Sequence, residues 1–354
     1  MQMIGISQTF PYRGKLSLAT HAVRNEVSAA ELELAAVKLD VVAQIKREYF
    51  TLAYVDDALA VVARTQGVLT ALVAASEVRY TAGNGHQADI LRARTELARL
   101  GEQASDLLEQ RRTAAARLDA AIGQDAGLPL GRATVPSPIV RAAVADSAVR
   151  VRFVSAALGA RAADSPLLSL DSLEALAEVG NPMLRAHQAR IAAQAARVEL
   201  ARKGYLPDVA IMLSYGYRAG FADMVSATIS LPIAIQKGRK QDAEVAGGMA
   251  ELAALEAEHR SAVHELRSTI ARQTSDVELA RTQLALSVRA ILPQSRAAFE
   301  SATSEYQVGR LDFDALMDAQ ASVYNAETAY YRSLTAFAIG LAELERTVGT
   351  GVLR

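Results

Sequence analysis

The five histidines are the side chains most able to do chemistry, and their spacing forms no established site. A helical zinc-protease motif needs two histidines separated by three residues, with a glutamate directly after the first. His259 and His264 are five residues apart, so they would not share one face of a helix. A lone exposed histidine such as His86 could bind a metal ion but is far more often without one. The full set is His21, His86, His187, His259 and His264.

Other catalytic motifs are absent from the sequence. The chain has no cysteine, which excludes disulfides, cysteine zinc sites and a thiol nucleophile. It has no Gly-x-Ser-x-Gly nucleophile elbow. Gly83-Asn84-Gly85 follows a predicted helix rather than a strand, which is not typical of a phosphate-binding loop. We therefore predict no catalytic, cofactor-binding or metal site, no cofactor, and no enzymatic activity.

Three carboxylates, Asp312, Asp314 and Asp318, follow a tyrosine–glycine turn. A ring of such carboxylates at a narrow entrance would favour cations over anions. Alternatively, they simply supply negative charge to the N-terminus of the next helix. The formal net charge of −1 gives no electrostatic reason to expect nucleic acid as a partner.

Long helices must position these residues, because proline is rare over two long stretches. No proline lies between Pro11 and Pro129, and only Pro293 follows Pro232. Apolar residues have heptad-like spacing from Val41 to Val73, and recur every seven residues from Val263 to Ile291. A period of 3.5 indicates helices packed in a left-handed supercoil, although ordinary amphipathic bundle helices remain the alternative.

The chain repeats itself at a constant offset, which aligns Tyr80 with Tyr306 and Gly83 with Gly309. The two turns read YTAGNGHQADILRA and YQVGRLDFDALMDA. Each repeat predicts a long helix, a tight turn and a shorter returning helix that stops at glycine. At 1.5 Å per residue, the long helices would each extend about 100 Å.

Short β-rich segments precede each long helix. Residues 3–10, 208–217 and 225–235 predict strands, and the last two form a hairpin. Alternating residues in 208–217, with tyrosines near the ends, suit a membrane-spanning strand; a small soluble hairpin capping a bundle is the alternative. The chain opens without a secretory-signal pattern, and its apolar runs are far shorter than the roughly 20 residues of a membrane-spanning helix.

Several segments together resemble the TolC-type outer-membrane efflux factors over nearly the whole chain. The similarity lies in NPMLRAHQARIAAQAARVELARKGYLPDVAI, in SLPIAIQKGRK, and in the tips YTAGNGHQADILRAR and YQVGRLDFDALMDAQASVYNAE. The short motif QTFPYRGKL is also similar to the heavy-metal branch of the CzcC and CusC type.

The resemblance implies a mainly α-helical fold with a small β part, built from coiled-coil hairpins. Three protomers would form one duct, with a shared outer-membrane β-barrel and a helical tunnel across the periplasm. The expected partners are two further copies of the chain, a periplasmic adaptor, an inner-membrane pump such as an RND transporter, and outer-membrane lipid. The duct would conduct passively, with heavy-metal cations as the first guess at cargo.

The resemblance also divides the chain into two repeats and a connector. The first repeat, 1–123, would hold strand 3–10, long helix 15–80 and returning helix 87–122. An equatorial connector would occupy 124–180. The second repeat, 181–349, would hold helix 182–203, strands 208–217 and 225–235, long helix 238–306 and returning helix 313–348.

Functional residues transfer from the family to the two turns. Ala82, Gly83 and Asn84 match one adaptor-contacting tip, and Val308, Gly309 and Arg310 match the other. Asp89 and Asp318 match acidic positions at the pore entrance. Two departures leave the gating network open, since Ala315 replaces an aspartate and Leu311 replaces an arginine that tethers the closed tip.

The second repeat contains a helix and a strand that the first repeat lacks. The offset between the repeats places their counterparts upstream of Met1, and an odd number of strands per protomer cannot alternate around a closed antiparallel ring. The sequence therefore predicts an N-terminally truncated efflux channel, for which export and conduction are open questions. A soluble coiled-coil scaffold or a non-functional remnant of a channel is the alternative.

Overall fold

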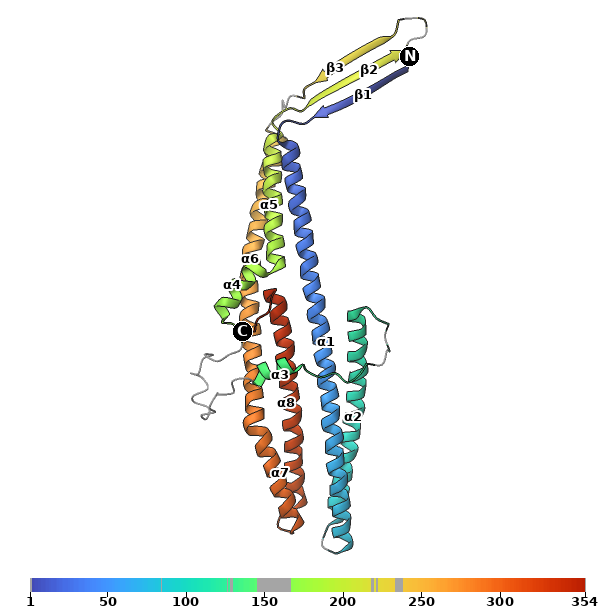
Figure 1. Ribbon diagram of the computed structural model, residues 1–354, viewed down its shortest axis with the longest axis vertical. Coiled ribbons are helices and arrows are strands. Elements are labelled where there is room, and N and C mark those ends of the chain that lie inside the picture. The colour runs from blue at the N-terminus through green and yellow to red at the C-terminus, as the bar shows by residue number, and fades with distance from the viewer. Residues whose placement is uncertain are drawn as a thin grey trace. The chain divides into compact units, whose positions relative to one another are not determined.

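The computed structural model describes residues 2–83, 85–125, 127, 130–144, 167–217, 220, 222–232 and 238–353. It is mostly helical with one small sheet, as expected (Figure 1). The elements are β1 (Gln2–Phe10), α1 (Lys15–Thr81), α2 (Gln87–Ile122), α3 (Ser137–Val144), α4 (Leu170–Gly180), α5 (Pro182–Lys203), β2 (Val209–Tyr217), β3 (Met224–Ser230), α6 (Gln241–Leu286), η1 (Ser287–Ile291), α7 (Leu292–Gln307) and α8 (Phe313–Val348).

The chain divides into two compact units. Unit 1 comprises Met1–Val37 with Glu178–Arg267, and unit 2 comprises Lys38–Ala177 with Ser268–Arg354. These units do not correspond to the predicted repeats. They are defined by contacts in space, and each of the long helices α1 and α6 has one part in unit 1 and the other in unit 2. The division into two repeats and a connector therefore stays a prediction.

The element bounds differ from the sequence expectation in three places. Helix α3 lies in the connector predicted over 124–180, for which no helix was specified. Strand β3 ends at Ser230, just before Leu231 and Pro232, and residues 233–237 fall outside the described part. The long helix expected over 238–306 begins at Gln241 and is interrupted by the π-helical turn η1.

That interruption has a local cause in Pro293, the second residue of α7. Proline has no amide hydrogen to donate, and its ring clashes with the carbonyl four residues earlier in a regular helix. Widening the preceding turn to a π-helix is one of the few ways to continue the helix past this obstacle. The hairpin of α7 and α8 therefore begins directly after this π-helical turn.

In unit 1, the sheet has the order β1-β2-β3 with both pairs antiparallel. Its register places Ile6 opposite Leu213, and Leu213 opposite Ala227. Among the strand residues whose side chains the structure describes, one face is consequently apolar apart from Gln8, with exposed Ile4, Ile6, Phe10, Ile211, Leu213, Tyr215, Tyr217, Val225 and Ile229. The other face carries mostly small and polar residues, among them Gly5, Ser7, Thr9, Ser214, Ser226 and Thr228.

The helices of unit 1 are α5 and the adjoining parts of α1 and α6. Asn181 caps α5 by accepting hydrogen bonds from the amides of Met183 and Leu184, at 2.9 and 3.1 Å. Helix α1 presents two seams of different chemistry. Ala22, Ala29 and Ala36, spaced by seven, are buried, whereas Leu16, Val23, Val27 and Leu34 are exposed.

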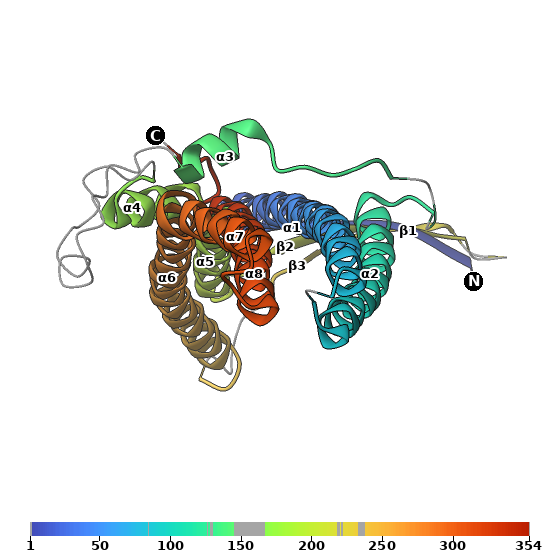
Figure 2. The ribbon, with the colours of Figure 1, turned by 90° about the horizontal axis from the view of Figure 1, so that it is seen from below.

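In unit 2, two helical hairpins pack together through a continuous core. The cluster joins Leu69 of α1, Ala93 of α2, Tyr306 of α7 and Leu316 of α8. Figure 2 shows these helices end-on, with α8 between α7 and α1 and with α2 on the other side of α1. Seven of the predicted heptad positions are buried, namely Leu52, Val55, Val62, Leu69, Ile270, Val277 and Leu284, whereas Val41 and Ile291 are exposed.

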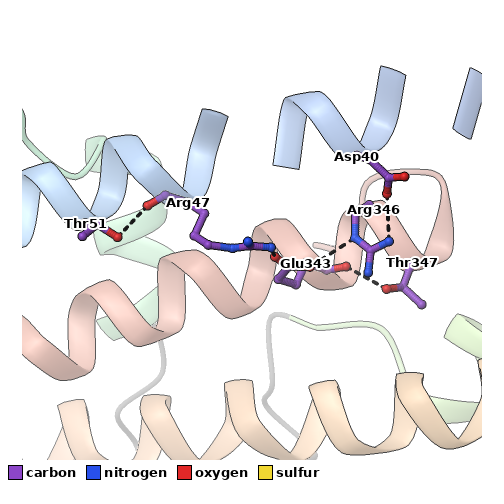
Figure 3. Close-up of polar contacts among 6 residues, drawn as sticks. All are labelled: Asp40, Arg47, Thr51, Glu343, Arg346 and Thr347. Atoms are coloured by element: carbon purple, nitrogen blue, oxygen red, sulfur yellow. Dashed lines mark hydrogen bonds and ion pairs between the residues drawn. The ribbon is translucent and has the colours of Figure 1, made fainter. Parts of the chain in front are cut away.

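An ion-pair network joins α1 to α8 (Figure 3). The guanidinium of Arg346 donates to Asp40 at 2.9 Å and to Glu343 at 3.1 Å, and Arg47 also pairs with Glu343. Burial alone would raise the pKa of Glu343, but the two arginines outweigh it and hold that pKa below its usual range. Lys46 adds a further pair with Glu345 at 2.7 Å.

Helix α1 also contains an 18-residue window that is apolar enough to cross a membrane by length and composition. This window is not an uninterrupted apolar run, and a window of this kind can include up to two charged residues. About a third of the window is buried inside the structure, 33%. Core helices of soluble proteins pass the same test, so the window by itself assigns no membrane span.

Candidate functional site

The first tip is the turn between α1 and α2. Helix α1 ends at Thr81, and Ala82 and Gly83 follow as an exposed turn. Gly83 has a φ of +78° and donates its amide to the carbonyl of Tyr80 at 3.0 Å. That φ favours glycine, which explains the residue type at the turn. Asn84, the third residue assigned to this tip, lies outside the described residues.

The second tip, between α7 and α8, repeats this geometry. Gly309 has a φ of +73° and donates to the carbonyl of Tyr306 at 3.1 Å. Val308, Gly309 and Arg310 are all exposed, and Val308 is the most open large apolar side chain here at 67%. The structure therefore brings each set of predicted tip residues together at a solvent-facing turn.

Arg79 links the two tips, and no sequence motif marks it. Its guanidinium donates to the carbonyl of Tyr306 and lies 4.5 Å from the centroid of the Tyr306 ring. The Tyr306 hydroxyl lies 3.3 Å from Ser76 Oγ, and its ring packs edge-on against Phe313. The end of α1 is thereby fastened to the end of α7.

A second link joins the returning helices. Arg92 of α2 pairs with Asp314 of α8 at 2.5 Å, and both side chains are more than half exposed. Asp314 directly precedes Ala315, where the resemblance led us to expect an aspartate. The expected gating pattern stays a prediction. Only the basic residues near each turn could have signalled the link between α2 and α8 in the sequence.

The two predicted entrance carboxylates lie near the starts of separate helices, at different depths and with different exposure. Asp89 is half-buried in the first turn of α2. Asp318 is exposed on α8 and borders an open hollow of about 480 Å³ with Ile291 and Asn325. Among the described residues, no group of three or more His, Cys, Asp or Glu side chains is placed to hold a metal ion.

Glu327 lies near the π-helical turn and pairs with two arginines. It accepts from Arg296 of α7 at 2.7 Å and from Arg64 of α1 at 2.9 Å. Burial would raise the pKa of Glu327, but these two hydrogen bonds prevail and lower it. Glu327 therefore stays ionised and ties α8 to both neighbouring helices.

Comparison with known proteins decides the family. Residues 2–124 and 174–350 match the profile of the outer membrane efflux protein family, which is most of the chain. The chain belongs to this family. The match makes it an outer-membrane efflux protein, and the family is one of efflux channels rather than enzymes. The resemblance found in the sequence is thus confirmed at family level, whereas the heavy-metal branch is not singled out.

Solved outer-membrane channels share the fold. The chain is similar to VceC from Vibrio cholerae, with a TM-score of 0.77 and 19% identity over 99% of this chain and 79% of that one. It is also similar to the outer-membrane channel OprN, with a TM-score of 0.78 and 20% identity over 99% of this chain and 80% of that one. The similarity to CusC has a TM-score of 0.80 and 16% identity over 99% of this chain and 77% of that one. No match was found among curated protein sequences.

Proposed function

We propose that this efflux protein is the passive exit duct of a tripartite efflux system. It would carry substrates from an inner-membrane pump and a periplasmic adaptor through the outer membrane. The observation that carries this proposal is the sheet β1-β2-β3, whose single apolar face is exposed in a chain of this family. Lipid would cover that face, and the small polar residues opposite would line an aqueous lumen.

A homotrimer would bury the second seam of α1. Leu16, Val23, Val27 and Leu34 are spaced by seven, four and seven residues and are exposed in one chain. This is the a/d pattern of a coiled-coil interface without its partner helix. Another copy of the same chain offers a matching helical surface, which supports a ring of protomers, and the family resemblance is the reason for proposing three.

The tips are proposed as the adaptor-binding surface. Ala82, Gly83, Val308, Gly309 and Arg310 are exposed on short turns, where an adaptor's helical hairpin could reach backbone and small side chains. Asn84 belongs to the same proposed surface. An RND-type pump would drive transport, so the duct itself would need no cofactor and perform no catalysis.

Asp89 and Asp318 are proposed to line the pore entrance. In a trimer each contributes three carboxylates, and such rings favour cations. This is the basis for proposing heavy-metal cations as cargo, ahead of organic compounds. A soluble scaffold, the alternative weighed from the sequence, has no use for the exposed apolar sheet face.

Planar-bilayer recording of the purified protein tests the channel proposal. We expect discrete conductance steps with a preference for K⁺ over Cl⁻, and Asp318→Asn should weaken that preference. Glu109→Asn is a matched control, because Glu109 is an exposed carboxylate on α2 that pairs with Arg112. Protein that inserts in lipid but never conducts would overturn the proposal, and protein that stays soluble without detergent would favour the scaffold.

Adaptor contact is testable by cross-linking, because the chain has no native cysteine. Val308→Cys should form cross-links with a co-expressed adaptor, whereas Leu108→Cys, exposed on α2 away from the tip, should not. Equal cross-linking at the two positions would contradict the assignment of the tips.

A further inference from the structure

Two histidines in unit 1 face each other across the contact between α5 and α6. The ring centroids of His187 and His259 lie 6.3 Å apart, with the ring planes tilted by 43°. Both side chains are partly buried. The proposed duct uses neither residue, since the tips and the entrance carboxylates belong to unit 2.

One nitrogen of this pair is chemically unsatisfied. Nδ1 of His259 is buried and has no hydrogen-bond partner. A buried polar atom without a partner destabilises the folded protein, so its persistence calls for an explanation. A metal ion bound at this nitrogen would satisfy its lone pair.

The distance between the rings suits an ion bound between them. A metal–nitrogen bond of about 2.0–2.1 Å places an ion roughly 3 Å from each ring centroid. The centroids are then about 5 Å apart at a tetrahedral angle and about 6 Å apart when the two nitrogens are opposite each other. The observed separation fits the second arrangement, in which the imidazoles are trans.

Charged side chains of both signs lie near the pair. Arg190, Glu258 and Glu33 all interact electrostatically with His187. Arg190 is itself paired with Glu33 of α1 at 2.5 Å. Glu258, the residue before His259, is a carboxylate that favours positive charge at His187.

We propose that His187 and His259 form a binding site for a copper(II)-like transition-metal ion. Imidazole is a preferred ligand of copper, and trans nitrogens fit its square-planar geometry better than the tetrahedral geometry of zinc. Because no third protein ligand is placed at the site in the described residues, water fills the remaining positions. The site stands on this geometry alone and does not depend on metal ions being the transported cargo.

Copper binding to the full-length chain in detergent tests the site. Metal-free protein is titrated with CuSO₄ against a competing chelator and monitored by electron paramagnetic resonance. We expect about one tightly bound Cu²⁺ per chain with hyperfine splitting from two nitrogens. His187→Gln and His259→Gln should each weaken binding at least tenfold, and Zn²⁺ should bind more weakly than Cu²⁺.

His264→Gln is the matched control, because His264 is exposed on the same helix five residues from His259. It should bind copper like the unaltered chain. Each variant is checked by thermal unfolding, and a variant that unfolds early is replaced by the corresponding asparagine. Equal binding by all three variants, or no binding by the unaltered chain at micromolar copper, would overturn the proposal. Channel conductance is measured separately, so failure of this site would leave the duct proposal standing.

Discussion

Tyr306 and Tyr80 occupy equivalent positions in the two tips but make different contacts. Tyr306 is 5% exposed and is held by Arg79, Ser76 and Phe313. Tyr80 is 47% exposed. The tyrosine–glycine signature therefore predicts the turn at both places, and it does not predict which tyrosine anchors the tip. That outcome depends on neighbours far away in the chain, since Arg79 and Ser76 belong to α1.

Replacing Arg79 should loosen the second tip. Arg79→Ala removes a stacking contact and a charged hydrogen bond, which together stabilise the turn by about 1–3 kcal/mol. We expect the amides of Gly309 and Arg310 to exchange with deuterium roughly tenfold faster, measured by mass spectrometry. Arg94→Ala, which breaks the exposed pair with Glu77, should leave these amides unchanged. Faster exchange in both variants would mean that the effect is not specific to Tyr306.

Glu327 should make the stability of unit 2 depend on pH. Its pKa is lowered in the folded state, so its stabilising contribution is complete above the unfolded value of about 4.3 and is lost as the pH falls through the folded value. Glu327→Gln should lower stability by about 1 kcal/mol at pH 7, a modest figure because both arginine partners are over half exposed. The difference between the two proteins should shrink below about pH 4.

Thermal unfolding of detergent-solubilised protein from pH 7 to pH 3 measures this difference. Glu109→Gln is the control, since the pair of Glu109 with Arg112 is largely exposed and should contribute little. A constant difference between Glu327→Gln and the unaltered chain across this range would show that ionisation of Glu327 is not what stabilises the contact.

At the scale of elements, the sequence predicted the helices well because their signals are local. Proline at the first position of α5, the cap at Asn181 and the glycine that follows α8 define helix ends within a few residues. Heptad spacing also identified residues that are buried, such as Leu52 and Val277. Val41 obeys the same spacing yet is exposed, because periodicity reports a face of the helix and not what covers it.

Close packing of α8 against α6 depends on a residue that no sequence pattern marked. A Cβ placed on Gly340 would lie 2.8 Å from Cγ2 of Val277. Gly340→Ala should therefore destabilise unit 2 by about 1–3 kcal/mol through overpacking. Adding Val277→Ala removes the clashing methyl groups and should recover part of the loss, as measured by chemical denaturation.

Gly101→Ala on α2 is the matched control, since nothing lies within 4 Å of the added methyl group. It should be neutral or stabilise the helix by up to about 1 kcal/mol, because alanine has the higher helix propensity. If Gly340→Ala behaves like Gly101→Ala, α6 and α8 can separate without cost and the close contact is not a constraint.

At the scale of the whole molecule, the difference between the two faces of the sheet is the feature that suits an outer-membrane protein. Alternation along residues 208–217 left a membrane strand and a soluble hairpin both open. The pairing of three strands strengthens the case for a membrane strand, because the isoleucine, valine and aromatic residues of β1 and β3 lie on the same face as the Ile, Val, Leu and Tyr residues of β2. That agreement between segments far apart in the chain could not be seen in any one of them.

The two faces should respond oppositely to charge. Ile6, on the apolar face, is 78% exposed in one chain, and Ser7 is the next residue on the opposite face. Arginine on a lipid-facing strand destabilises membrane insertion by about 2–4 kcal/mol at mid-depth, whereas a lumen-facing position tolerates charge. Ile6→Arg should therefore strongly reduce the amount of protein folded into lipid vesicles, and Ser7→Arg should not. Protease protection after folding into vesicles measures both variants, with Ile6→Val as a conservative control. Equal losses for the two arginine variants would show that the apolar face does not meet lipid, and would leave the exposed sheet without a partner in the proposed duct.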